Sequence, residues 1–442
     1  MTIEKSINSL QEEPFTEESV FQYVEDFSFP RLAGTEGERK AVALTIQRFN
    51  EIGFKQEEII QEPFEFSDFY STTLIKLVGM ITCIFLLAFL LFSYIEIYIS
   101  LLILAVLGAI VVMIMRGLKS PEDPGFWGKY YGEIFEATNV YVKVPSKKLP
   151  EQEAGNIVIS AHLDSKSQNF KTAIRVNVYR LFVIGGFSFC IFILIKTIWY
   201  FLFMGFYFAI KLRTWILVGL LLDYGLWISA GCIIIANLFL MFLNTHNKSP
   251  GALDNASGMA IVFELSSYFR TNPLKNYNVW FCQFSAEELG TMGSRIFLNN
   301  QKEEFEQGKI FQYNIDMISC KGCSKHNRIE YIESYGIIPK KKFTTLCSKY
   351  LERAALKNNI DIFGVHFLTG AHTDSLPFHA KEFDALDLGS ISASKWGHTA
   401  EDTPDKVDSK ILKETCVLLK NALLEIDSDY YKLDNRIEYS KK

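Results

Sequence analysis

Seven residues that can bind a metal ion or move a proton stand at the ends of apolar segments or in turns. They are His162, Asp164, Asp254, Glu287, Glu288, Asp316 and His398. Two histidines and three carboxylates from this set supply nitrogen and oxygen ligands, which suit two divalent cations that share one bridging carboxylate. The other two carboxylates can orient a ligand or accept a proton. The pattern therefore predicts a two-metal site.

The stretch 251–258, GALDNASG, places Asp254 in a turn with glycine on both sides. The residues after Asp254 provide a turn and a helix cap, and an apolar helical run, Met259 to Phe269, follows. A carboxylate held in such a turn can reach two cations at once. We therefore expect Asp254 to be the shared ligand.

His162 and Asp164 close a predicted strand over residues 156–164. Residues i and i+2 of a strand point to the same face. Asp164 is therefore predicted to hold the imidazole of His162 by the nitrogen that does not bind metal. Taken alone, the same motif is equally typical of a structural pair.

The other four candidate residues lie in three further motifs. Glu287 and Glu288 follow a strand in QFSAEELG, where one carboxylate can bind metal while the other takes a proton from water. Two solvated glutamates are the alternative. Asp316 lies inside an apolar strand, where a buried carboxylate needs a cation or strong donors. His398 lies in a polar loop before the last predicted helix.

The order of five motifs resembles the di-zinc aminopeptidase family that includes glutamate carboxypeptidase II, the transferrin receptor and glutaminyl cyclase. The motifs are HLDS, GALDNASG, SAEELG, NIDMI and WGHTAEDTPD, and RLAGTEGE near the start is similar to that family's N-terminal signature. The resemblance covers the part of the chain outside its apolar blocks. It implies that Asp254 bridges two zinc ions. It further implies that His162 and Asp316 hold one ion, Glu288 and His398 hold the other, Glu287 is the general base and Asp164 orients His162.

The resemblance implies a membrane-anchored zinc peptidase in which water activated by two metals hydrolyses a peptide bond, most simply an aminopeptidase. A carboxypeptidase, a glutaminyl cyclase-like acyltransferase and a non-catalytic membrane scaffold remain alternatives. The chain departs from the family at residues 373–378, TDSLPF, where relatives often have Ser-Asp-His before Pro-Phe. This loop lines the substrate pocket in relatives. Asp374 and Ser375 are therefore expected to contact substrate, although the specificity of relatives does not carry over.

Strands that alternate with helices predict an α/β fold with a mixed, mostly parallel sheet covered by helices on both faces. The expected strands are 54–67, 138–145, 156–164, 278–284, 311–318, 361–367 and 384–391. The expected helices are 14–28, 36–52, 259–269, 340–357 and 407–426.

Four apolar runs interrupt this pattern, namely Leu77–Ile95, Ile97–Met115, Phe182–Ile210 and Trp215–Leu243. Each is long enough to cross a ~30 Å hydrocarbon layer as a helix. The sequence therefore predicts two transmembrane hairpins inserted into one catalytic domain. The expected parts are catalytic segments 1–73, 117–177 and 245–442, with hairpins at 74–116 and 178–244.

The second hairpin contains Lys196 and Asp223, and charges within a span are functional candidates. Placement near an interface is the alternative. If the two residues pair, Asp223→Asn should lower the melting temperature in detergent, whereas an unchanged melt would dismiss the pair.

Charged residues near the predicted spans indicate orientation. One side carries Lys76, Arg116, Lys119, Lys171, Arg175, Arg180 and Lys248, whereas the other carries Lys211 and Arg213. The positive-inside rule places the catalytic domain in the cytoplasm, and the polar first residues contain no signal peptide. The expected partners are the lipid bilayer and peptides close to it.

Two further features of the composition bear on function. The net charge of −5 comes without a basic stripe, which argues against nucleic acid as a partner. Cys320 and Cys323 form a CKGC motif, which is consistent with a tight turn or with a redox or metal role.

Overall fold

A computed structural model describes residues 14–93, 95, 97–117, 121–122, 131–205, 212–322, 327–335, 341–342, 345–367 and 373–433. The chain divides into two compact units. The sheet unit comprises Met1–Phe64, Glu136–Ser167 and Asn247–Lys442, and the helical unit comprises Glu65–Phe135 and Gln168–His246. Each unit is therefore assembled from segments that are far apart in the sequence.

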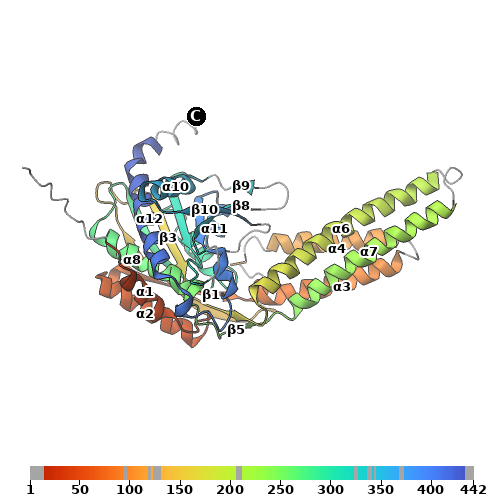
Figure 1. Ribbon diagram of the computed structural model, residues 1–442, viewed down its shortest axis with the longest axis horizontal. Helices are drawn as coiled ribbons and strands as arrows, with labels where there is room; N and C mark the ends of the chain where they lie inside the picture. The colour runs from red at the N-terminus through yellow and green to blue at the C-terminus, as the bar shows by residue number, and fades with distance from the viewer. Residues whose placement is uncertain are drawn as a thin grey trace, which may run out of the picture. The chain divides into compact units, whose positions relative to one another are not determined.

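In the described part of the chain, nine strands form one mixed sheet with parallel strands at its centre (Figure 1). β3 pairs in parallel with both β6 and β7, and β7 pairs in parallel with β11. The outer pairs β2–β6 and β11–β8 are antiparallel. In spatial order the strands are β1 (Ile59–Ser67), β2 (Ile134–Val144), β6 (Tyr277–Phe284), β3 (Gly155–His162), β7 (Ile310–Ile315), β11 (Asp384–Gly389), β8 (Ile329–Tyr335) and β10 (Ile362–Phe367), with β9 (Lys341–Lys342) beside β8.

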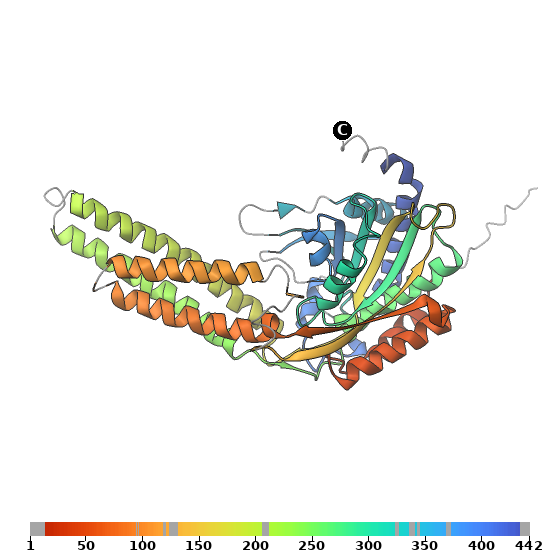
Figure 2. The same ribbon diagram turned by 180° about the vertical axis from the view of Figure 1, so that it is seen from behind.

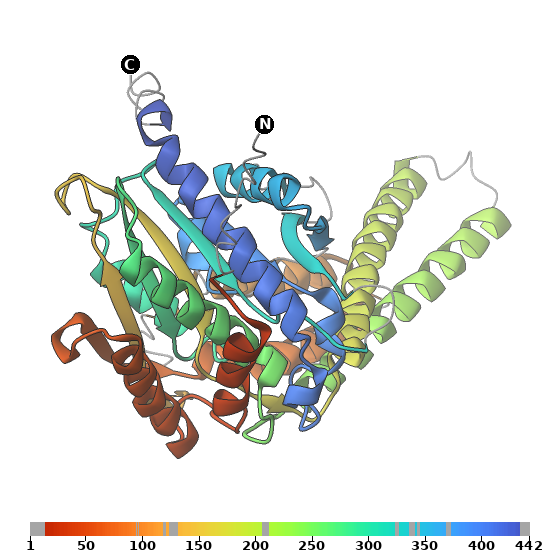
Figure 3. The ribbon, with the colours of Figure 1, turned by 60° about the vertical axis from the view of Figure 1, so that its left-hand side comes forward.

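Helices cover both faces of this sheet, which explains why β3, β6 and β7 are buried along their whole length. One face packs against a core shared by α1 (Glu17–Phe27), α2 (Glu36–Ile52), α8 (Ser257–Thr271), α10 (Leu346–Asn358) and α12 (Ser409–Ser428). Figure 3 shows α8 and α12 lying across it. The other face packs against α9 (Met292–Asn300) and α11 (Leu376–Ala380). The predicted α/β class is confirmed.

Short helical turns join several of these elements. They are η1 (Gln56–Glu58), η2 (Phe69–Thr73), η3 (Ala252–Ala256), η5 (Ile391–Lys395) and η6 (Pro404–Lys406). Two expectations about the strands were wrong. β3 ends at His162, so Asp164 follows this strand instead of closing it, and β7 ends at Ile315, so Asp316 follows that strand instead of lying inside it. Several elements were not predicted, among them β8, α9 and α11.

The helical unit contains α3 (Leu74–Phe92), α4 (Ile97–Gly117), α6 (Thr172–Gly205) and α7 (Leu212–Met241), which run alongside one another (Figure 2). Phe89 of α3, Phe189 of α6 and Leu226 of α7 share one apolar cluster. Many large apolar side chains on these helices are nevertheless exposed. Two short strands, β4 (Ser167–Gln168) and β5 (Thr245–His246), form a separate small sheet.

Among the described residues, three helical segments are long and apolar enough to cross a membrane: Phe69–Phe92, Ile174–Leu202 and Arg213–Met241. The apolar helix at Tyr98–Ile114 is shorter. The prediction of apolar helices is therefore confirmed, whereas the fourth span remains a prediction.

Two charged or reactive features singled out from the sequence also have defined positions. Lys196 Nζ lies 2.6 Å from Asp223 Oδ1, so these residues pair between α6 and α7. Cys320 is in a disulfide, and Cys323 lies outside the described residues.

Candidate metal centre

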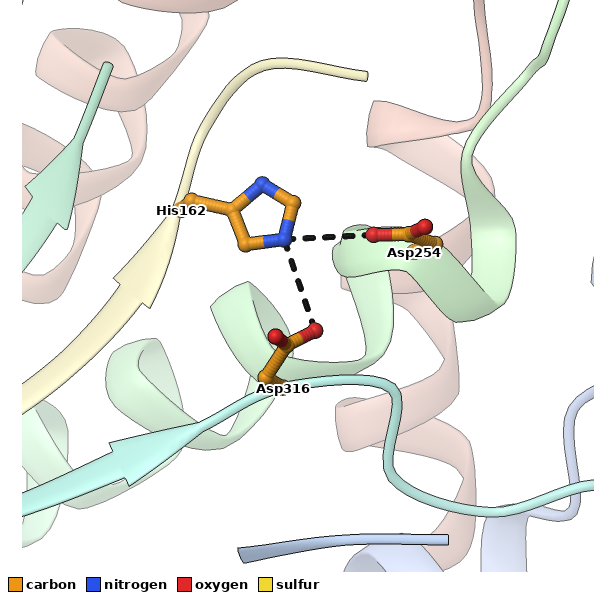
Figure 4. Close-up of side chains that lie close together, drawn as sticks. All are labelled: His162, Asp254 and Asp316. Carbon is orange, nitrogen blue, oxygen red and sulfur yellow. Dashed lines mark ion pairs between the residues drawn. The ribbon is translucent and has the colours of Figure 1, made fainter. Parts of the chain in front are cut away.

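The first cluster of ligand atoms forms where β3 and β7 end side by side. His162 closes β3, and Asp316 follows β7, so parallel pairing brings the two side chains together. His162 Nε2 lies 3.2 Å from Asp254 Oδ1 and 3.5 Å from Asp316 Oδ1 (Figure 4). These three side chains are close enough to one another to hold one metal ion.

The second cluster forms on the other oxygen of Asp254. His398 Nε2 lies 3.0 Å from Asp254 Oδ2 and 3.1 Å from Glu288 Oε2. Asp254, Glu288 and His398 could hold a second ion. Asp254 therefore offers one oxygen to each cluster, which is the geometry of a bridging ligand.

The turn that carries Asp254 is held by local contacts as well as by its position before α8. Ser257 Oγ donates to Leu253 O at 2.7 Å, and Asn255 Nδ2 donates to Ile315 O at 2.8 Å. The second bond ties the turn directly to the end of β7. Gly258 packs so closely that an added Cβ would lie 2.4 Å from Ile315 O, so this position requires glycine.

The donor atoms of both clusters fit bound cations. Four of them, among the described residues, are buried without a hydrogen-bond partner: His162 Nε2, Asp254 Oδ2, Glu288 Oε1 and Asp316 Oδ1. Burying carboxylates without compensation is costly, and a metal ion supplies that compensation. The residues present therefore fit two metal ions.

The charges of the two clusters shift the pKa values of their members. Burial acts to lower the pKa of His162, yet the neighbouring carboxylates of Asp164, Asp254 and Asp316 raise it well above its usual value. Burial acts to raise the pKa of Asp254, but the two histidines hold it well below its usual range. Each cluster thus stabilises a positive charge beside the carboxylate of Asp254.

Glu287 lies beside both clusters but belongs to neither. Burial, followed by repulsion from Glu288 and Asp316, raises the pKa of Glu287 well above its usual value, although His162 opposes this shift. The backbone turns sharply before it, since Ala286 has a φ of 57°. That turn lets two adjacent glutamates face one site.

The structure assigns the Asp164 carboxylate contacts that the sequence did not predict. Asp164 Oδ1 accepts the Glu287 backbone N–H at 3.1 Å, and Oδ2 accepts that of Glu288 at 3.2 Å. His162 Nδ1 lies 3.0 Å from the Asp164 carbonyl oxygen, whereas Oδ1 is 3.6 Å away. Asp164 thus positions the glutamate pair with its side chain and contacts the imidazole mainly through its backbone.

Asp374 lies on the same face of the sheet as His162. Its carbonyl oxygen accepts a hydrogen bond from Gln312 Nε2 at 3.2 Å, and the same amide donates to Ser160 Oγ, two residues before His162, at 3.0 Å. Neither carboxylate oxygen of Asp374 has a hydrogen-bond partner among the described residues. Burial is the main cause that raises its pKa to about 7.

Ser375 fixes the loop instead of facing an open site. Its Oγ donates to Asp387 Oδ2 at 2.5 Å, and the side chain is buried. The expected substrate contact of Asp374 and Ser375 remains a prediction, because residues 368–372 of the same loop lie outside the described part of the chain.

Three charged residues at the site were not singled out from the sequence: Arg31, Lys166 and Asp402. Lys166 Nζ lies 2.7 Å from Glu288 Oε2 and donates to Glu288 O at 3.0 Å. With His398, it holds the pKa of Glu288 at about 2 in spite of burial. Arg31 lies in the RLAGTEGE motif, which contributed to the family resemblance but did not assign a role to Arg31.

Comparisons with known proteins agree with this geometry. Residues 242–422 match the sequence model of peptidase family M28. The chain is 26% identical over 183 residues to Aminopeptidase YwaD of Bacillus subtilis (strain 168), a match that covers 40% of this chain and 38% of that protein. The chain thus aligns with well under half the length of this curated relative.

Two solved structures share the fold. The zinc aminopeptidase BSAP from Bacillus subtilis superposes with a TM-score of 0.52 at 13% identity, covering 94% of this chain and 96% of that one. A glutaminyl cyclase from an Acidobacteriales bacterium gives a TM-score of 0.51 at 15% identity, covering 97% and 99%. At these identities the similarity shows the fold alone. The sequence match includes Asp254, both glutamates, Asp316 and His398, so the similarity to peptidase family M28 extends to five of the seven candidate residues.

Proposed function

We propose that this protein is a zinc metallopeptidase that removes residues from the N-terminus of peptides. The observation that carries this proposal is one buried carboxylate, Asp254, whose two oxygens face two separate ligand clusters. Glu287 stands beside both clusters without belonging to either. The aminopeptidase name of a sequence relative supports the same reaction class.

In this proposal His162 and Asp316 hold one zinc ion, Glu288 and His398 hold the other, and Asp254 bridges them. Bound zinc would lower the pKa of a water molecule and polarise the carbonyl group of the scissile bond. Asp254 presents a different carboxylate oxygen to each cluster from a single turn, so binding two ions would require little rearrangement of the ligands. The site is thereby organised before substrate arrives.

Glu287 is the proposed general base. Its carboxylate would accept a proton from the attacking water, and the resulting acid would return that proton to the leaving amine. Positive charge at the clusters favours its ionised form, since burial among carboxylates otherwise raises its pKa. Asp164 binds the N–H groups of both glutamates, which keeps the base next to the metal ligand Glu288.

Other activities are possible on the same scaffold. A carboxypeptidase would use the same water chemistry, and the fold is shared with a glutaminyl cyclase. The presence of both complete ligand clusters favours a two-metal hydrolase over a cyclase-like acyltransferase or a non-catalytic scaffold. We therefore keep these activities as outcomes of the test.

The test uses the full chain in detergent, loaded with zinc, and pairs of short peptides with free or acetylated N-termini. We expect release of the first amino acid only from peptides with a free N-terminus. Glu287→Gln should lower kcat by at least about a hundredfold while retaining its zinc, whereas Glu25→Gln, a change at an exposed glutamate, should have no effect. Release from acetylated peptides would indicate a carboxypeptidase. No release by zinc-loaded protein would contradict the proposal.

We also propose that the protein is a multi-pass membrane protein with its active site in the cytoplasm. Three apolar helices and the predicted distribution of lysine and arginine support this location. Asp254 follows Leu243 by 11 residues, a length of chain that spans at most about 40 Å. Substrates would therefore be peptides at the membrane surface or released from it.

A further inference from the structure

Arg31 connects the loops that carry the ligands of both clusters. Its side chain is fully buried, and its guanidinium donates only to backbone carbonyl oxygens in the described contacts. Nε donates to Leu163 O at 2.7 Å, next to His162. The other acceptors are Pro250 O at 2.6 Å, Gly251 O at 2.9 Å, Phe27 O at 2.7 Å and Phe29 O at 3.2 Å.

Asp402 binds the same turn by accepting hydrogen bonds from the backbone N–H groups of the turn. Its side chain is also fully buried. Oδ1 accepts from Leu253 N at 2.7 Å, and Oδ2 accepts from Asp254 N at 3.2 Å. The backbone oxygen of Asp402 accepts from Ala252 N at 3.2 Å. The buried guanidinium of Arg31 therefore holds the carbonyls at the start of the turn, and the buried carboxyl group of Asp402 holds the amides of Leu253 and Asp254.

The turn is shaped to admit these two groups. Gly251 has a φ of 67°, and a Cβ added there would lie 2.7 Å from Arg31 Nη1 and 2.6 Å from Asp254 O. A side chain at this position would thus displace the guanidinium. Burial lowers the pKa of Arg31 to about 10, and the charge of Asp402 opposes this shift. The two residues compensate each other across the turn, since burying either charge alone is costly.

We propose that Arg31 and Asp402 are positioning residues that set the place of Asp254 and thereby the zinc affinity of both positions together. This inference rests on the proposed two-zinc site. Neither residue belongs to a ligand cluster. A ligand such as Asp316 serves one position, whereas the turn that holds Asp254 serves both. Arg31 also makes the N-terminal segment, outside the region matched by the family model, a part of the metal site.

The test is a zinc titration of the metal-free full chain by calorimetry against a competing chelator. Arg31→Lys keeps the charge but loses the fork of donors, and Asp402→Asn keeps the shape but loses the charge. We expect each variant to weaken both zinc-binding steps by about tenfold or more, the range measured for groups that orient metal ligands. Arg270→Lys is the matched control, because Arg270 forms a partly exposed pair with Glu58 at 3.4 Å. This control should bind zinc as the wild type does.

The melting temperature of each metal-free variant separates positioning from a purely structural role. Lower stability with unchanged zinc affinity would overturn the proposal, as would a loss confined to one binding step. If Arg31→Lys does not fold, Asp402→Asn decides, and failure of both to fold would also overturn it. A wild-type chain that binds no zinc would instead contradict the proposed function, so the two failures are distinguishable.

Discussion

Lys166 gives the two ligand clusters different electrostatic surroundings. Its ammonium lies 2.7 Å from Glu288 Oε2, the same oxygen that His398 contacts at 3.1 Å. The cluster of His162 and Asp316 has no such cation among its described ion pairs and is close to the carboxylate of Asp164. A cation at the Glu288 position must therefore bind against a neighbouring positive charge.

We expect Lys166→Met to raise the affinity of the Glu288–His398 position for zinc. Removing a partly buried charge a few ångströms away should change that affinity on the order of tenfold, whereas the first position should change much less. Stepwise zinc titration of the metal-free protein measures both affinities. Lys147→Met, at an exposed lysine, is the control. Equal effects on both steps, or none, would show that Lys166 does not create the difference.

The sequence could single out the residues that form the two clusters, because their types and order carry information that survives without a structure. It could not predict the roles of Arg31 and Asp402, because the turn that both residues bind offers them backbone groups more than 140 residues away. The same reason explains Asp164, whose carboxylate binds two backbone amides in addition to lying 3.6 Å from the imidazole of His162. Every residue has such amides, so no side-chain pattern marks them.

At the scale of elements, prediction succeeded where an apolar run is continuous and was less successful where polar residues interrupt it. The central strands and the long helices follow the expected ranges closely. β8 was missed because Glu330 and Glu333 break its pattern. Glu330 is nevertheless buried, since its carboxylate accepts from Arg328 at 2.8 Å and from Ile391 N at 2.7 Å. Such compensation depends on tertiary contacts.

The Lys196–Asp223 ion pair joins α6 and α7 near the end of α3, which packs against both helices. Phe89, three residues before the end of α3, contacts Phe189 with a ring separation of 5.4 Å. Lys196 lies seven residues, or about 10 Å, farther along α6. The Lys196–Asp223 pair, with a separation of 2.6 Å, therefore lies near the level at which α3 ends. There, α6 and α7 depend mainly on each other.

We expect Asp223→Asn to lower the melting temperature of the protein in detergent by a few degrees, because Lys196 would lose its ion pair with the Asp223 carboxylate. The side chains are 18% and 23% exposed, so the loss should be about 1 kcal/mol, less than for a fully buried pair. The double variant Lys196→Met with Asp223→Leu removes both charges and should recover most of the loss. An unchanged melt for Asp223→Asn would show that the pair does not stabilise the hairpin.

At the scale of the whole molecule, two segments of the helical unit interrupt the sequence of the sheet unit, whose strands nevertheless form one mixed sheet in the described part of the chain. This arrangement was predictable because apolar runs of membrane length differ sharply in composition from the segments around them. The pairing of α3 with α4 agrees with the predicted hairpin, whereas the pairing of α3 with α7 was not predictable, because helices that are apolar on all sides carry little information about neighbours far away in the sequence.

The proposed orientation predicts on which side of the membrane a reporter protein fused to each part of the chain will lie. A phosphatase that folds only outside the cytoplasm should be active when inserted after Ser93, between α3 and α4. The same enzyme fused to the C-terminus should be inactive, whereas a fluorescent protein fused there should be bright. Reversed results would contradict the cytoplasmic site, and release of the protein by alkaline carbonate would contradict membrane insertion.

The measurement that tests the central claim most directly is an anomalous difference map from crystals of the zinc-loaded full chain, collected at the zinc absorption edge. The account predicts two peaks, one between His162 and Asp316 and the other between Glu288 and His398, with a different oxygen of Asp254 facing each. A single peak, or peaks away from Asp254, would contradict the two-zinc site.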